Sequence, residues 1–283
     1  MIPYHDISPE IFRIGPIAIR WYGLMYVFGY VVGFLLLKWR VRRGLFPTNY
    51  LQASNLIQYL IIGMIIGARI AYVIFYDFSA YSIGDKGLLD VFKVWQGGLS
   101  FHGAITGMVA ASLIYSWKYK IDFFLVTDAI AFCGTLGIFF GRMGNFINGE
   151  LWGRVTSIPW GMNFPKSGDQ LARHPSQLYE AFGEGVFIFL VIYFIQMRLV
   201  KKKVYKPGVL GIIFLVLYGA VRFVVEFFRQ PDEQLGFVVG SLSMGQLLCV
   251  AMVILGGLIY WLFLDKKEVF IPRVPKLSEI EEN

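Results

Sequence analysis

Long apolar stretches follow one another along almost the whole chain, separated by short charged connections. Seven of them reach the length of a membrane span, at residues 17–37, 55–76, 97–117, 123–142, 178–198, 208–228 and 243–264. A bilayer core of ~30 Å requires about 20 apolar residues in a helix. The stretches are too long for strands, and backbone in lipid must satisfy its hydrogen bonds within its own segment. The pattern predicts an all-α integral membrane protein, a bundle of about seven transmembrane helices.

The composition favours the same class. Of the 283 residues, 57% are hydrophobic and 16% are charged, and the mean hydropathy is +0.60. Ordinary soluble domains carry about 25% charged residues, so this chain has too few polar groups to cover a surface in water. The high hydrophobicity also excludes intrinsic disorder. Cys133 and Cys249 lack the spacing of a metal or redox site, which favours two inert buried thiols.

Lysine and arginine are distributed unevenly between the two sides of the predicted membrane domain, residues 1–264. Fifteen lie on the side of the C-terminus and eight on the other. Cytoplasmic loops are the richer in these residues, so we expect the N-terminus outside and the C-terminus in the cytoplasm. The net charge of +7 then reflects topology and contact with membrane lipids, not a nucleic acid partner. Residues 143–177 predict an extracytoplasmic loop or cap, and residues 265–283 a loose cytoplasmic tail.

Ionisable residues inside the apolar stretches are informative because each costs about 2.5–3.5 kcal/mol at mid-membrane. They are Arg69, Asp77, His102, Asp128, Arg142, Glu150, Glu180, Glu184, Arg222 and Glu226. Most lie near the outer ends of their stretches under the topology given above. The distribution predicts a polar cavity that opens near the outer leaflet.

The sixth stretch places four polar residues on one helical face. Tyr218, Arg222, Glu226 and Arg229 are separated by four, four and three positions, which brings them together on an α-helix. One interpretation is a structural Arg222–Glu226 ion pair with Arg229 reaching the membrane interface. The other is a phosphate site, because a guanidinium group binds phosphate through two parallel hydrogen bonds.

A second polar run begins where the fourth stretch ends. Arg142, Asn145, Asn148 and Glu150 lie within nine residues, interspersed with glycines that permit sharp turns and close approach to a ligand. The run suits an anion site with amide donors. It is equally compatible with a helix end capped by Gly144 and followed by a solvated loop.

Histidine is scarce, and its placement bears on the chemistry. His102 lies early in the third stretch. Histidine is the residue type best suited to act as a base at neutral pH, although a packing role is the commoner one for such a residue. Gly103, Gly107 and Ala111 form a stripe of small residues that predicts close helix packing. No zinc-protease motif is present, and neither a metal nor an organic cofactor is expected.

The polar runs together carry a family pattern. In the run 141–153 the matching positions are Gly141, Arg142, Gly144, Asn145, Phe146, Asn148, Glu150 and Gly153. This run resembles the signature of the prolipoprotein diacylglyceryl transferase family. Further similar segments are Arg20–Gly23 with Tyr26, Phe101–Gly103, His174–Glu180 and Arg222–Asp232. Ala104 departs from the family, which usually has a second glycine after the histidine.

The resemblance implies an enzyme of the bacterial cytoplasmic (inner) membrane with its active site toward the extracytoplasmic side. It implies transfer of the diacylglyceryl group of phosphatidylglycerol to the lipobox cysteine thiol of a preprolipoprotein signal peptide. The products are a thioether and glycerol phosphate. We expect Arg142 and Arg222 to hold the phosphate and His102 to act as the base. Head-group contacts or orienting roles are expected for Asn145, Asn148, Glu150, Tyr26, Tyr218, Glu226 and Arg229.

Three other functions compete with this interpretation. A lipid or anion transporter would be favoured by inverted repeats or paired broken helices, and the sequence contains neither. An intramembrane protease would need a Ser–His pair or paired aspartates, and Asp77 and Asp128 lie in no such motif. A membrane receptor would not require the compact group of Arg, Asn and Glu.

Overall fold

The computed structural model describes residues 2–4, 7–15, 17–78, 88–94, 97–230, 237–239 and 242–281. Each predicted apolar stretch contains a helix. The α-helices are α1 (Trp21–Arg42), α2 (Tyr50–Tyr76), α4 (Phe101–Tyr119), α5 (Phe123–Asn148), α6 (Ser176–Glu180), α7 (Ile188–Lys201), α8 (Val209–Val225), α9 (Met244–Ile259) and α10 (Leu277–Glu281). The π-helix η4 (Ala181–Phe187) joins α6 to α7, and the π-helix η5 (Tyr260–Leu264) extends α9. Short 3₁₀-helices are η1 (Leu88–Phe92) and η3 (Pro165–Ser167).

Several of the helices have the length and surface of membrane spans. Within the described residues, five helical segments are long and apolar enough to cross a bilayer, at 21–42, 50–76, 123–148, 176–201 and 244–264. Helix α8 is apolar but has 17 residues, and α4 is not among the five. Large apolar side chains lie on the outside, such as Trp117 at 82% and Phe75 at 78% exposure. Such a surface suits lipid, so the chain is a mostly helical integral membrane protein.

Short strands lie before and between the helices. Strands β2 (Glu10–Ile14) and β3 (Ile17–Arg20) form an antiparallel hairpin. Strands β1 (Ile2–Pro3), β4 (Met162–Asn163) and β5 (Ala172–Arg173) form a sheet in the order β1-β4-β5, and β6 (Phe237–Val239) pairs with β7 (Leu242–Ser243). The prediction that the first helix begins at residue 17 is therefore wrong. Residues 17–20 form strand β3 of the hairpin, and the helix begins at Trp21.

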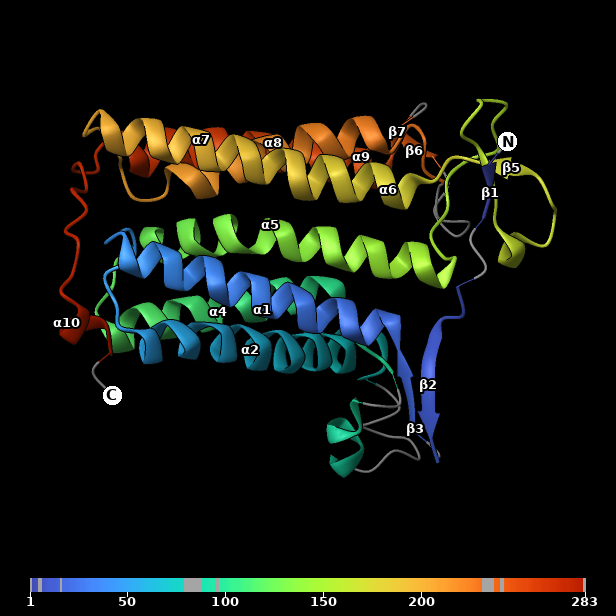
Figure 1. Ribbon diagram of the computed structural model, residues 1–283, viewed down its shortest axis with the longest axis horizontal. Helices are drawn as coiled ribbons and strands as arrows, with labels where there is room; N and C mark the ends of the chain where they lie inside the picture. The colour runs from blue at the N-terminus through green and yellow to red at the C-terminus, as the bar shows by residue number, and fades with distance from the viewer. Residues whose placement is uncertain are drawn as a thin grey trace. The chain divides into compact units, whose positions relative to one another are not determined.

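The chain divides into two compact units, residues 1–37 with 128–272 and residues 38–127 with 273–283. In the second unit, α2 and α4 lie side by side (Figure 1). Glycines meet backbone to backbone along this contact. A Cβ atom added at Gly67 would lie 2.3 Å from the Gly103 carbonyl oxygen, and one at Gly107 would lie 2.0 Å from that of Gly63. The predicted packing role of the Gly103–Gly107 stripe is confirmed.

The predicted loose tail is partly ordered within the second unit. It contains α10, where Ile280 is 3% exposed. Gly44 (φ +68°) leaves no space for a side chain, because an added Cβ atom would lie 2.1 Å from the Arg273 carbonyl oxygen. An apolar contact and a close backbone approach thus hold part of a segment whose charge and prolines suggested a free end.

Two of the charges predicted inside apolar stretches have structural roles. In the first unit, the buried Asp128 of α5 accepts hydrogen bonds from the Tyr205 hydroxyl (2.6 Å) and from the backbone of Gly208 (2.7 Å) and Gly211 (2.9 Å). This carboxylate therefore caps the first turn of α8. In the second unit, Arg69 donates to four backbone carbonyl groups of the segment that leads into α4, including Gly97 at 2.9 Å.

Close packing also brings the site-bearing helices of the first unit together. A Cβ atom added at Gly183 would lie 2.9 Å from a methyl group of Val221 on α8. One added at Gly185 would lie 2.6 Å from Cβ of Phe139 on α5. The π-helix η4 consequently packs tightly against both helices, and π-helical turns of this kind recur at functional sites.

Candidate functional site

Three members of the second polar run, Arg142, Asn145 and Asn148, lie on a helix and not in a loop. Helix α5 continues past the predicted end at residue 142 to Asn148, and the left-handed turn comes at Gly149 (φ +61°). Gly144 is in the helix interior, where an added Cβ atom would lie 2.8 Å from the Tyr22 ring of α1. The cap interpretation of Gly144 is therefore wrong. Its lack of a side chain gives α1 space to approach α5.

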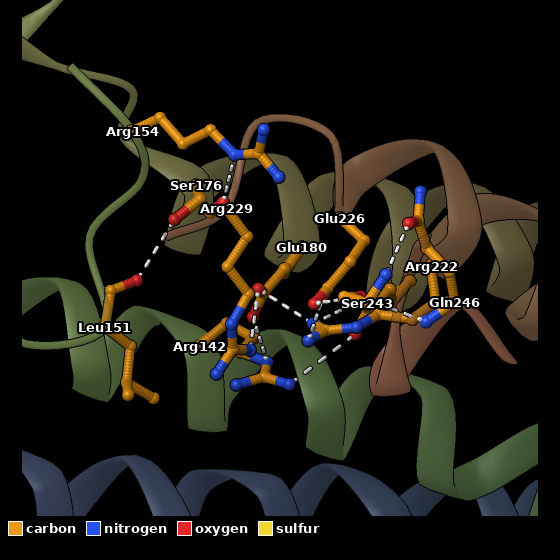
Figure 2. Close-up of polar contacts among 11 residues, drawn as sticks. Arg142, Leu151, Arg154, Ser176, Glu180, Arg222, Glu226, Arg229, Ser243 and Gln246 are labelled. Carbon is orange, nitrogen blue, oxygen red and sulfur yellow. Dashed lines mark hydrogen bonds and ion pairs between the residues drawn. The ribbon is translucent and has the colours of Figure 1, made fainter. Parts of the chain in front are cut away.

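Glu180 is the centre of an ionic cluster. Its carboxylate contacts Arg142 Nε at 2.7 Å, Arg222 Nη1 at 2.8 Å and Arg229 Nη1 at 3.3 Å. Figure 2 shows the three guanidinium groups converging on this carboxylate from α5, from α8 and from the segment after α8. The Glu180 side chain is fully buried, so the three cations supply the partners that a buried carboxylate requires.

Two more glutamates complete what we call the guanidinium–carboxylate cluster: Arg142, Arg222, Arg229, Glu180, Glu184 and Glu226. Glu184, one helical turn after Glu180, lies 3.4 Å from Arg222 Nη1 and 3.8 Å from Arg142 Nη2. Glu226 lies 2.9 Å from Arg222 Nη2, which confirms the predicted i,i+4 pair. Three positive and three negative groups balance, as burial in a low-dielectric environment demands.

The three guanidinium groups differ in how fully the carboxylates occupy them. Both terminal nitrogens of Arg222 contact carboxylates. Arg142 makes one short contact, through Nε, and its side chain is the most exposed of the three, at 21% against 14% for Arg222. An arginine has five N–H donors, so Arg142 retains donors for an anionic ligand. Charge-assisted bonds of this kind are the strong ones.

The two asparagines and Glu150 form a separate group at the end of α5. Asn145 Nδ2 donates to Glu150 Oε1 at 2.8 Å, and Asn148 Nδ2 lies 3.4 Å from the same oxygen. The Glu150 backbone carbonyl accepts from Gln177 Nε2 at 2.7 Å, which ties this group to α6. Within the contacts described, Glu150 orients the asparagines and not the arginines.

Tyr4 covers the end of α5. Its hydroxyl donates to the Phe146 carbonyl oxygen at 2.5 Å and lies 3.1 Å from that of Ile147. Burial and the negative charge of Glu150 raise the pKa of Tyr4 to about 12. The phenol stays neutral at physiological pH and continues to satisfy carbonyl groups that the helix leaves unpaired.

The cap segment is joined to the end of α8. The Arg154 backbone N–H donates to the Phe228 carbonyl oxygen at 2.9 Å, and Arg154 Nε donates to that of Arg229 at 2.8 Å (Figure 2). Ser176 is the first residue of α6, and no side chain caps the start of this helix. The Ser176 hydroxyl donates to the Leu151 carbonyl oxygen at 3.0 Å. These bonds fix the backbone from which Arg229 reaches Glu180.

Arg229 was expected to share the helical face of Arg222. Helix α8 ends at Val225, so Arg229 lies beyond it, where it pairs with Gly153 in a β-bridge. Its side chain nevertheless enters the cluster. The last positions of the predicted matching segment, Pro231 and Asp232, lie outside the described residues.

The two tyrosines that were predicted as head-group contacts also lie in the first unit. The Tyr26 hydroxyl is 2.9 Å from that of Tyr22, whose ring packs against Gly144. Tyr218 precedes Arg222 by one turn of α8. Both phenols therefore belong to helices that bear or contact the polar groups described above.

The histidines occupy different environments. His102 lies in the first turn of α4 in the second unit, with an exposed side chain. His174 lies in the first unit, where its Nδ1 is 3.2 Å from the Tyr179 hydroxyl and where burial lowers its pKa. The residue is therefore neutral at pH 7. Among the described residues, no group of three or more His, Cys, Asp or Glu is arranged to hold a metal ion.

Sequence reasoning missed the central role of Glu180. Its signals were a carboxylate in an apolar stretch, four positions before a second one, Glu184, and its place at the end of the family-like segment His174–Glu180. The role of Ser243, which donates to Glu226 at 3.1 Å, was also missed. A Ser-x-x-Gln capping pattern at the start of an apolar stretch was the available signal.

Known proteins resemble this chain over nearly its full length. The family model for prolipoprotein diacylglyceryl transferase matches residues 9–262. Proteins named phosphatidylglycerol–prolipoprotein diacylglyceryl transferase are 43% identical in Bordetella parapertussis (92% of this chain, 97% of the relative) and 44% in Coxiella burnetii (95% and 100%). A third, from a Wolbachia pipientis strain, is 46% identical (90% and 94%). The chain therefore belongs to the prolipoprotein diacylglyceryl transferase family.

Proposed function

We propose that this protein transfers the diacylglyceryl group of phosphatidylglycerol to the lipobox cysteine of preprolipoprotein signal peptides, the first step of bacterial lipoprotein maturation. Its relatives are named for transfer from phosphatidylglycerol to prolipoprotein. The guanidinium–carboxylate cluster supports the assignment of this function to individual residues. In it, Arg142 keeps N–H donors that its carboxylate partners do not occupy.

The reaction is a displacement at carbon. A bond forms between the cysteine sulfur and the glyceryl carbon, and the bond from that carbon to the phosphate oxygen breaks. The electron pair leaves with glycerol phosphate, and the thiol proton must pass to a base or to that phosphate. A thiol is weakly ionised at neutral pH, so the site has to accept a proton and stabilise the charge that develops on the phosphate.

Arg142 and Arg222 are placed to meet the second requirement. Arg142 offers the phosphate oxygens its unoccupied donors, whereas Arg222 is held between Glu180 and Glu226 at 2.8 and 2.9 Å. A guanidinium group fixed in this way needs no reorganisation when charge develops, which is the advantage of a preorganised site. Arg229 and Glu226 contribute to the electrostatic field of the cluster and hold the arginine side chains in place.

The groups around the cluster are suited to the lipid head group. Asn145 and Asn148, oriented by Glu150, supply amide groups for the glycerol hydroxyls. The Tyr26 and Tyr218 hydroxyls supply further contacts from α1 and α8. These side chains combine an apolar body with a polar tip, as an interfacial lipid requires.

His102 is proposed as the base that takes the thiol proton. The exposed imidazole on α4 is accessible to a substrate, and its ring nitrogens can accept a proton. The leaving phosphate is the competing proton acceptor. Replacement of His102 by Gln with an unaltered rate near neutral pH would remove the histidine from this role.

We further propose that seven helices span the bacterial cytoplasmic membrane, with the N-terminus outside, the C-terminus in the cytoplasm and the active site toward the extracytoplasmic side. The distribution of Lys and Arg supports this orientation. Single cysteines placed in the cap and in the tail, labelled with a membrane-impermeant reagent in intact cells, test it. Labelling of the tail and not the cap would reverse the topology.

The proposed reaction is tested with labelled phosphatidylglycerol and a lipobox peptide in proteoliposomes. Wild-type protein should give a covalent thioether product, whereas mere movement of the lipid between leaflets would favour a transporter. Replacement of Arg142 by Lys keeps the charge but removes the planar fork, and we expect transfer to fall by about 10²–10³-fold. Arg13→Lys, at an exposed arginine of the β2–β3 hairpin that pairs with Glu10 and not with the cluster, is the matched control. Full transfer by Arg142→Lys would contradict the phosphate role.

A further inference from the structure

Ser243 stands between the helix α9 and the guanidinium–carboxylate cluster. It is the N-cap of α9, where its Oγ accepts from the Gln246 backbone N–H at 3.2 Å, and Gln246 Oε1 accepts from the Ser243 backbone N–H at 3.0 Å. This reciprocal capping box satisfies two of the N–H groups that a helix start leaves unpaired. The Ser243 hydroxyl hydrogen is not needed for it.

The Ser243 hydroxyl hydrogen is instead donated to the guanidinium–carboxylate cluster. Ser243 Oγ donates to Glu226 Oε1 at 3.1 Å, and Glu226 Oε2 lies 2.9 Å from Arg222 Nη2 (Figure 2). The two oxygens of one carboxylate therefore link the cap of α9 to Arg222. Ser243 is 4% exposed and Glu226 7%, so water does not readily replace either bond.

The backbone beside Ser243 leaves little freedom for Glu226. A Cβ atom added at Gly245 would lie 2.9 Å from Glu226 Oε1 and 3.1 Å from its carboxyl carbon. The first turn of α9 thus contacts the carboxylate directly, and the positive end of the helix dipole favours an anion at this place. The carboxylate is held both by a hydrogen bond and by the shape of the turn.

We propose that Ser243 is a positioning residue of the active site, which orients Glu226 and, through it, the Arg222 guanidinium toward the phosphate. The effect of Ser243 on catalysis rests on the proposed function. The structural part of the inference, that Ser243 is coupled to Glu226, does not depend on the reaction.

Two substitutions of nearly equal shape separate positioning from helix capping. Asp and Asn cap a helix about as well as Ser. Ser243→Asn retains an N–H donor for Glu226, whereas Ser243→Asp has only acceptors and faces the Glu226 carboxylate with a second negative charge. We expect Ser243→Asp to lower the rate of diacylglyceryl transfer by roughly ten- to a hundredfold and Ser243→Asn to keep it within about threefold of wild type.

Asn49 provides the matched control, because it caps α2 through an equivalent Asn-x-x-Gln box. Asn49→Asp introduces the same carboxylate at a helix start in the other unit and should not change transfer. If Ser243→Asp transfers at the wild-type rate, or if Ser243→Asn and Ser243→Asp lose the same fraction of activity, Ser243 has no positioning role.

Thermal unfolding tests the coupling without the reaction. Ser243→Asp should lower the melting temperature, and adding Glu226→Gln to it should recover part of the loss, because the Gln amide donates to the new carboxylate. Glu226→Gln in the wild-type background should not raise the melting temperature. Additive losses in the double variant would overturn the coupling. Absence of thioether product from wild-type protein would instead overturn the proposed function. The unfolding comparison would still show whether Ser243 and Glu226 are coupled.

Discussion

The α2–α4 pair and the guanidinium–carboxylate cluster join helices in opposite ways. In the second unit, Gly63, Gly67, Gly103 and Gly107 bring two helix backbones into direct contact. In the first unit, six charged side chains link α5, α8 and the α6–η4 segment. Helices in lipid gain little from the hydrophobic effect, because their neighbours are equally apolar. Close packing and polar links are the two remaining sources of affinity.

The difference shows which kind of contact leaves room for chemistry. The glycine contact brings backbone against backbone, and the glycines themselves carry no side-chain donors for a ligand. The ionic cluster balances its charge but does not use all its donors, since an arginine has more N–H groups than its carboxylate partners occupy. A contact of the second kind holds helices together and still leaves N–H donors for an anion.

The largest effect should come from filling the glycine contact. Gly67→Leu places a side chain where a Cβ atom would already lie 2.3 Å from the Gly103 carbonyl oxygen. Overpacking costs about 1–3 kcal/mol where side chains move, and more where backbone must. We expect loss of folded protein in detergent, measured by size-exclusion chromatography and thermal unfolding.

A glycine without neighbours gives the control for this substitution. Gly257 of α9 has no heavy atom within 4 Å of an added Cβ, so Gly257→Leu should fold as wild type does. If Gly67→Leu also remained folded with an unchanged melting temperature, the close approach of α2 and α4 would not be the source of their affinity.

Both kinds of contact were partly visible in the sequence. The four-residue spacing of Gly103 and Gly107 predicted close packing, and that of Arg222 and Glu226 predicted an ion pair. Such patterns repeat within one helix, where geometry is fixed by 3.6 residues per turn. The five helical segments that are long and apolar enough to cross a bilayer were predictable for a similar reason, because their length follows from the bilayer.

What the sequence did not reveal depends on partners far along the chain. Glu180 meets Arg142 and Arg222, which lie 38 and 42 positions away from it, through the π-helical turn of η4. Nothing local indicates such a meeting. The hairpin 10–20 was hidden because a strand and a helix start can be equally apolar over a few residues. The role of Gly144 was predicted wrongly because, in a sequence, a glycine that makes room for a neighbouring helix cannot be distinguished from one that ends a helix.

The ionic cluster should respond to single substitutions by a smaller, graded amount. Glu180 makes three contacts within 3.3 Å, whereas Glu184 has its nearest at 3.4 and 3.8 Å. Removing one partner of a well-paired buried charge costs about 3–5 kcal/mol. We expect Glu180→Gln to lose about 3 kcal/mol of unfolding free energy and Glu184→Gln about 1 kcal/mol, measured by denaturant unfolding in lipid–detergent mixtures. Equal losses would contradict the central position of Glu180.

The smallest effect is expected at an ion pair outside the membrane. Asp169 contacts Arg173 at 2.5 Å and accepts from Ser167 Oγ at 2.8 Å, and these bonds lower its pKa to about 2. Because the folded-state pKa lies below the ordinary value of about 3.9, the pair stabilises the fold above that pH. The contribution is lost as the pH falls through about 2.

Asp169→Asn should therefore lower the melting temperature only slightly at neutral pH, because the exposed Asp169 carboxylate is screened by solvent and salt. The difference from wild type should shrink as the pH is lowered from about 5 toward about 2, and it should also shrink in high salt. Glu180→Gln should keep its deficit in high salt, because the buried cluster is screened much less. A salt-insensitive deficit at Asp169, or a salt-sensitive one at Glu180, would mean that burial does not separate the two ionic contacts.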